Sequence, residues 1–60
     1  MEIEKGQKWS IKNSNRSPVV IDSYDKYSEK VYWHNEDSPS MVFDSDYSYF
    51  IDAFSLVENI

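Results

Sequence analysis

The sequence predicts a small all-β fold, a bent sheet of about five short strands that closes into a barrel, with one helical or 3₁₀ turn before the last strand. Short segments of alternating apolar and polar residues are separated by runs of turn-forming residues. The chain of 60 residues has two Trp, five Tyr and three Phe but no Cys. We expect one domain, residues 1–60, because so short a chain is too small for two stacked sheets.

The first strand is expected from Gln7 to Ile11. Trp9 and Ile11 alternate there with polar residues, which is the period-two pattern of a half-buried strand. Residues 13–17 are a run of turn formers, and Pro18 has no backbone N–H to donate. A hairpin loop should therefore follow the first strand.

The second and third strands are short and rich in β-branched or aromatic residues. Residues 19–21 are all β-branched, which predicts the second strand. A polar segment, residues 22–29, separates it from the third strand at residues 30–34. Val31 and Trp33 should share one face of that third strand.

Residues 35–40 give the strongest loop signal in the chain because they combine acidic residues, serines and Pro39. Met41 to Phe43 should form a brief fourth strand after this loop.

The last part of the chain changes period. Tyr47, Phe50, Ile51 and Phe54 recur at spacings of three and four, which predicts a short helix or 3₁₀ turn, with a longer helix within residues 45–57 as the alternative. Asp44, Ser45 or Asp46 is expected at its N-cap, and residues 56–58 should be extended. The expected core consists of Trp9, Val20, Val31, Trp33, Phe50 and Phe54.

The pattern of apolar residues resembles that of a known protein family. Gly6 followed by Trp9, then the segment 31–33 and the closing segment 50–58, are similar to the small SH3-like β-barrel proteins of bacteriophage and bacterial genomes. Those proteins often open with Gly-x-x-Trp and end in Phe-x-x-x-Phe-x-Leu-Val. The resemblance implies an SH3-like barrel, plausibly phage-encoded, that binds a protein or a nucleic acid. Members that bind nucleic acids usually present a basic face, whereas the second half of this chain is acidic.

Charge is distributed unevenly along the sequence. All six Lys and Arg residues lie in the first 30 positions, so residues 31–60 carry carboxylates only and predict a one-sign surface. An acidic, Tyr-rich face would suit a larger protein with a basic patch, since tyrosine is a favoured anchor in protein interfaces. A simple solvated surface is the alternative. The candidate partner-binding residues are Tyr32, Glu36, Asp37, Asp44, Asp46, Tyr47, Tyr49 and Asp52.

Catalytic, metal and cofactor sites are not expected. The chain has one Gly and one His and lacks Cys, so it has no phosphate-binding glycine loop, nucleophile elbow or usual zinc ligand set. Asp44, Asp46 and Ser48 have the opening spacing of a calcium loop. That loop also needs Gly at its sixth position and Glu at its twelfth, where Tyr49 and Ser55 stand.

The sequence therefore predicts a non-enzymatic protein-binding module that docks on a larger host or bacterial protein and modulates it, with inhibition as the first expectation. One alternative is a nucleic-acid mimic or a nucleic-acid-binding barrel, and another is a small structural or self-assembling phage component, including a homo-oligomer. The charged start lacks the apolar segment of a signal peptide, and no apolar run approaches the roughly 20 residues of a membrane span. We expect a cytoplasmic protein without membrane contact.

Overall fold

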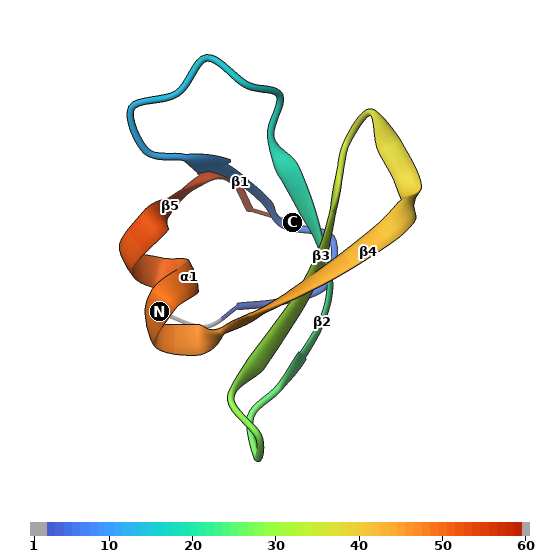
Figure 1. The fold of residues 1–60 in the computed structure, drawn as a ribbon, viewed down its shortest axis with the longest axis vertical. Coiled ribbons are helices and arrows are strands. Elements are labelled where there is room, and N and C mark those ends of the chain that lie inside the picture. The colour runs from blue at the N-terminus through green and yellow to red at the C-terminus, as the bar shows by residue number, and fades with distance from the viewer. Residues whose placement is uncertain (1–2, 60) are drawn as a thin grey trace.

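The computed structural model describes residues 3–59 and contains five antiparallel strands and one short helix (Figure 1). The elements are β1 (Lys8–Ile11), β2 (Val19–Asp25), β3 (Lys30–Asn35), β4 (Ser38–Asp46), α1 (Tyr47–Ala53) and β5 (Phe54–Glu58). The mostly β architecture and the short helix before the last strand agree with the prediction. Met1, Glu2 and Ile60 of the predicted domain lie outside the described residues.

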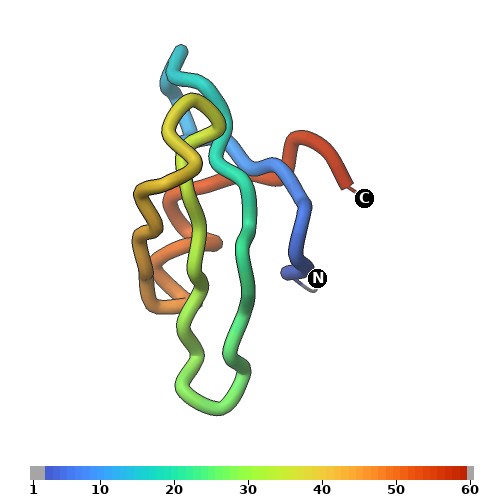
Figure 2. The backbone as a smooth tube through the Cα atoms, turned by 90° about the vertical axis from the view of Figure 1, so that its right-hand side faces the viewer, coloured from blue at the N-terminus to red at the C-terminus, as the bar shows by residue number. Residues whose placement is uncertain are grey.

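The strands form one sheet in the order β4-β3-β2-β1-β5, which leaves β4 and β5 at its two edges. The pairing among the described residues gives one open sheet and does not show the barrel closure that the sequence predicts. Figures 1 and 2 show a strongly bent sheet from which the β2–β3 hairpin projects. In Figure 2, α1 lies on one side, and the first and last of the described residues lie on the other. Within the described part of the chain, no helix has the length and apolar composition needed to cross a membrane.

The core contains Ile3, Trp9, Val19, Ile21, Val31, Phe50 and Phe54, all of them buried. Two of the six predicted core residues differ from this set. Trp33 is only partly buried and packs against the core, whereas the prediction for Val20 is wrong because this residue is not in the buried cluster. Side chains alternate along a strand, so burial of Val19 and Ile21 turns Val20 to the opposite face.

Five aromatic rings form a continuous chain through the structure. Phe50 of α1 meets Trp9 of β1 edge-on with ring centroids 5.3 Å apart, and it stacks on Phe54 at 4.3 Å. Trp33 of β3 lies 5.5 Å from Phe54 and 4.9 Å from Phe43 of β4. These ring contacts connect both edge strands and the helix to the interior strands of the sheet. Such contacts stabilise the fold beyond the effect of burying the rings.

Four strands are longer than the sequence predicted, β2 and β4 most of all. β2 continues to Asp25, and β4 begins at Ser38, so only Glu36 and Asp37 of the predicted loop lie outside strands. The pairing of β4 with β3 shifts register between Ser38 and Val42. An edge strand with such an irregularity tolerates Pro39, which cannot donate a backbone hydrogen bond.

A bulge in β2 contributes to the bend. The register with β3 shifts between Ile21 and Ser23, which leaves Asp22 as an extra residue. Its Oδ2 lies 2.8 Å from Nδ1 of His34 on the neighbouring strand. The chain's one imidazole is thus held in place within the sheet by the bulge carboxylate.

Candidate partner-binding surface

The eight residues predicted to form one acidic, Tyr-rich face fall into three groups. Tyr32, Asp44 and Asp46 lie on β3 and β4, Glu36 and Asp37 form the β3–β4 turn, and Tyr47, Tyr49 and Asp52 lie on α1. The turn is about 13 Å from Tyr32 along β3, given a rise of about 3.3 Å per residue. The structure therefore keeps the first group together but separates it from the turn.

The first group surrounds a lysine. Tyr32 is the cross-strand partner of Asp44, and Lys30 is the partner of Asp46, so these side chains share the outer face of the β3–β4 pair. Nζ of Lys30 lies 2.9 Å from Oδ1 of Asp46 and 3.8 Å from Oδ2 of Asp44. The hydrogen bond to Asp46 and its negative charge raise the pKa of Lys30 above 10.5.

Asp46 also occupies the N-cap position of α1, which is one of the three positions that the sequence proposed. Its side chain makes no capping hydrogen bond and is directed to Lys30 instead. The carboxylate therefore connects two strands rather than satisfying the first turn of the helix.

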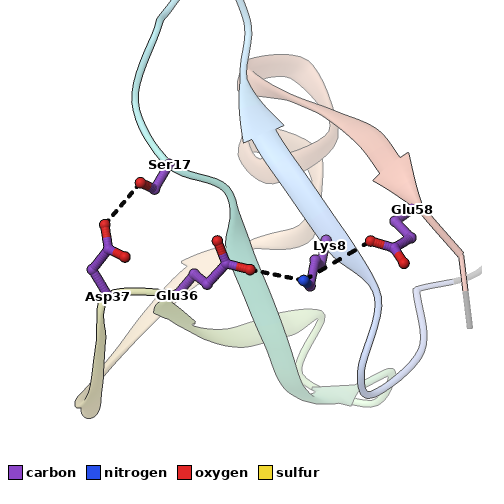
Figure 3. Close-up of polar contacts among 5 residues, drawn as sticks. All are labelled: Lys8, Ser17, Glu36, Asp37 and Glu58. Atoms are coloured by element: carbon purple, nitrogen blue, oxygen red, sulfur yellow. Dashed lines mark hydrogen bonds and ion pairs between the residues drawn. The ribbon is translucent and has the colours of Figure 1, made fainter.

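The turn residues contact β1 and the loop between β1 and β2, as Figure 3 shows. Oε1 of Glu36 lies 2.7 Å from Nζ of Lys8, which is also 3.9 Å from Oε2 of Glu58 on β5. The hydrogen bond from Lys8 to Glu36 and the nearby negative charges raise the pKa of Lys8 above 10.5. Asp37 accepts a 2.8 Å hydrogen bond from Oγ of Ser17. Both turn carboxylates thus have partners within the chain and fix the position of the hairpin.

The helix carries the third group. The ring of Tyr47 is half-buried and lies 5.3 Å from the ring of Tyr24. Tyr49 is 64 % exposed, and Asp52 is exposed without an ion pair to another described residue. Tyr49 and Asp52 are thus the members of this group that are open to a partner.

The sequence did not identify a run of three exposed apolar residues in the described part of the chain. Met41, Val42 and Phe43 are 57 %, 55 % and 39 % exposed, and they lie in succession on β4, one of the two edge strands. We call residues 41–46 the β4 edge. Val42 lies opposite His34 on the outer face, whereas Phe43 lies opposite Trp33 on the inner face. The β4 edge therefore presents apolar side chains on both sides of a strand that has no neighbour on its outer side among residues 3–59.

The expectation of a one-sign surface needs correction. Four of the six carboxylates from the second half of the chain lie within 4 Å of a lysine from the first half: Glu36, Asp44, Asp46 and Glu58. Lys8 and Lys30 each take two of them, because antiparallel pairing brings distant parts of the chain side by side. The acidic character of the β4 edge is thus reduced, although two carboxylates still outnumber one ammonium group.

The ion pair at the β4 edge leads to a prediction about pH. Replacing Asp46 with asparagine should lower the pKa of Lys30 towards 10.5, because it removes the largest cause of the upward shift. A raised pKa means that this pair stabilises the fold fully below pH 10.5 and that the contribution is lost as the pH rises through the pKa of Lys30 in the folded chain. An NMR titration of the Lys30 side chain measures the change. Asp52→Asn is the control. An equal pKa of Lys30 in the two variants would contradict the ion pair between Lys30 and Asp46.

The described side chains do not form a candidate metal site. Among residues 3–59, no three His, Asp or Glu side chains come together in a way that could hold a metal ion.

Compared with known protein families, with curated proteins and with solved structures, the chain matches none of them. Its function therefore has to follow from the geometry of the chain itself.

Proposed function

We propose that this chain is a non-enzymatic protein-binding module that docks on a larger protein through the β4 edge and modulates it. The observation that carries the proposal is the exposure of Met41, Val42 and Phe43 on an edge strand that also carries two carboxylates. Large apolar side chains that lie together on a surface commonly mark an interaction site. The partner is a protein with an extended segment flanked by a basic patch.

The backbone of the β4 edge supports recognition by strand addition. An edge strand has unpaired N–H and C=O groups that can hydrogen-bond an extended segment of another protein. Val42 and Phe43 point to opposite faces, so each would contact a different side of the added strand. The backbone would contribute affinity, and these two side chains would contribute specificity.

The negative charge of the β4 edge favours a partner with a basic surface. Asp44 and Asp46 lie on the outer face beside Tyr32, and Lys30 offsets part of their charge. We expect this arrangement to influence the association rate and the choice of partner more than the affinity. Tyr49 and Asp52, which are exposed on α1, extend the acidic surface beyond the strand.

The SH3-like barrel is part of the same proposal. A strongly bent, five-stranded antiparallel sheet with a short helix directly before the last strand supports it. The resemblance to barrel proteins of bacteriophage and bacterial genomes makes a bacterial protein the first partner to test, with inhibition of that protein as the expected effect.

Affinity purification of the tagged chain from a nuclease-treated bacterial lysate tests the proposal. The unmodified chain should retain one protein in stoichiometric amount. Val42→Lys should weaken its binding about tenfold or more, because the change places a cation at the centre of the contact. The Asp44→Lys, Asp46→Lys double variant should weaken it as well.

Val57→Lys is the matched control. Val57 is equally exposed but lies on β5, at the opposite edge of the sheet, so binding should persist. Equal retention by the Val42 and Val57 variants would exclude the β4 edge as the contact. Capture that disappears after nuclease treatment would indicate nucleic acid instead.

Self-association is a second candidate, because the β4 edge is suited to pairing with a second copy. In a two-fold antiparallel pair centred on Phe43, Asp44 lies opposite Val42 and Asp46 lies opposite Ser40. No carboxylate then faces another across the pair. Light scattering over a range of concentrations should show a dimer that Val42→Lys dissociates, and a monomer throughout would eliminate this candidate.

A further inference from the structure

We propose that a pocket between α1, β1 and β5 binds an apolar organic anion, meaning a carboxylate carried on an aryl or alkyl group. The pocket has a volume of about 320 Å³ and is lined mainly by Trp9, Lys12, Tyr47, Ile51, Phe54 and Leu56. This volume lies at the lower end of the range of about 300–1,000 Å³ for small-molecule sites. The α1 pocket, as we call it, lies outside the β4 edge, so this inference is independent of the proposed function.

The floor of the α1 pocket belongs to the core. Trp9 and Phe54 are buried, and both rings contact Phe50, which fixes their positions. A site whose floor is held in this way exists before the ligand arrives and needs little ordering on binding.

The walls of the α1 pocket provide apolar surface for a ligand to cover. Ile51 is exposed on the helix, and Leu56 of β5 is half-buried. A bound aryl or alkyl group would remove part of both side chains from water, which is favourable in proportion to the area covered. The body of the ligand should therefore be apolar.

Lys12 determines the charge of the ligand. Its backbone N–H donates to the carbonyl of Ala53 at 2.9 Å, which anchors the residue beside the end of α1. Lys8 and Lys30 are each held by two carboxylates, whereas Lys12 has no carboxylate within 4 Å among the described residues. In a chain of net charge −5, an uncompensated ammonium group at an apolar pocket favours an anion there.

NMR titration of the full chain with three matched probes tests the proposal. The probes are 4-phenylbutyrate, 4-phenylbutan-1-ol and 4-phenylbutylamine, which share an apolar body and differ in charge. The acid should shift the amide signals of Ile51 and Leu56 in a saturable way with a Kd of about 1 mM, as expected for a ligand of this size. The alcohol should bind more weakly, and the amine most weakly.

Lys12→Gln should weaken binding of 4-phenylbutyrate about two- to fivefold, the range for one exposed charge pair, and leave binding of the alcohol unchanged. Lys26→Gln is the control, because it removes the same charge from the distant β2–β3 turn. Equal binding of the three probes, no saturation at about ten times the expected Kd, or equal effects of the two variants would overturn the proposal.

A second variant tests the location of the site. Ile51→Glu places a carboxylate at the pocket, so it should weaken 4-phenylbutyrate binding about tenfold, while circular dichroism confirms that the helix remains. Unchanged affinity would overturn the assignment of the ligand to the α1 pocket. The Val42→Lys variant should bind the acid normally, so failure of this inference is distinguishable from failure of the proposed protein contact.

Discussion

Replacing Phe50 with alanine is expected to unfold most of the chain at room temperature. The side chain of Phe50 is 0 % exposed, and its ring stacks on Phe54 and meets Trp9 edge-on. Truncating a buried Phe typically reduces the free energy of unfolding by about 3–5 kcal/mol, because both the buried area and the packing around it are lost. A domain of this size has a net stability of only about 3–5 kcal/mol, so the loss is comparable to the whole.

Urea denaturation followed by circular dichroism and Trp fluorescence measures the effect. Tyr49→Ala is the matched control, since it truncates the preceding aromatic residue on the same helix, which is 64 % exposed. We expect that variant to change the free energy of unfolding by less than about 1 kcal/mol. Phe50→Leu should recover most of the stability because it preserves most of the buried volume. Equal midpoints for Phe50→Ala and Tyr49→Ala would mean that α1 does not bury Phe50 against the sheet.

The position of α1 was predictable because its apolar residues recur at the helical period. Its end was less clear, because Phe54 fits two patterns at once. It lies four residues after Phe50, as on a helix face, and two residues before Leu56, as on a strand face. The structure ends the helix at Ala53 and places Phe54 at the start of β5, with φ −120° and ψ 156°.

Side-chain direction in β2 was not predictable from its composition. Three consecutive β-branched residues contain no alternation, so residues 19–21 identified a strand but not its buried face. The pairing with β3 and β1 decides that Val19 and Ile21 enter the core.

The order of charges along the chain predicted a one-sign surface that the folded chain does not have, also because strand pairing could not be foreseen. Lys30 and Asp46 lie in opposite halves of the sequence, yet they are direct partners across β3 and β4. The same applies to Lys8 and Glu58 across β1 and β5. Charge order along a chain therefore predicts a one-sign surface only where the strands of each half stay separate.

The position of the candidate surface at a sheet edge depends on topology. Residues 41–43 were recognisable as a strand, but their exposure follows from the place of β4 at the end of the strand order. An interior strand with the same residues would have had a neighbouring strand on each side. The sequence could identify exposed tyrosines and carboxylates as binding candidates, but it could not identify this apolar segment.

Replacing Gln7 with leucine is expected to reduce the free energy of unfolding by about 2–4 kcal/mol, although leucine is apolar and similar in size. Gln7 is 1 % exposed and connects both ends of the chain. Its Oε1 accepts hydrogen bonds from Nε1 of Trp9 at 3.1 Å and from the backbone N–H of Glu4 at 3.0 Å. Its Nε2 donates to Oδ1 of Asn59 at 2.9 Å.

The cost arises because leucine removes the acceptor and leaves the donors in place. The indole N–H of Trp9 is buried with the rest of the side chain, and a buried donor without a partner costs about 1–3 kcal/mol. Thermal and urea denaturation should show the loss. Asn59→Ala is the control, because it removes the acceptor of Nε2 but leaves Oε1 of Gln7 to both donors. Asn59 is exposed, so water can take its place beside Nε2, and the change should cost only about 0.5–1.5 kcal/mol.

Gln7→Glu separates the role of the acceptor oxygen from that of the amide donor. The new carboxyl keeps an acceptor for Trp9 and Glu4, but when ionised it places a buried charge against Oδ1 of Asn59. Burial should raise its pKa in the folded chain, so stability should be greatest below the pKa of the unfolded chain and fall as the pH rises through the higher, folded value. Gln7→Leu should show no such added pH dependence. If Gln7→Leu were as stable as the unmodified chain, Trp9 and Glu4 would have found other acceptors, and the N-terminal segment would not depend on this side chain for its position.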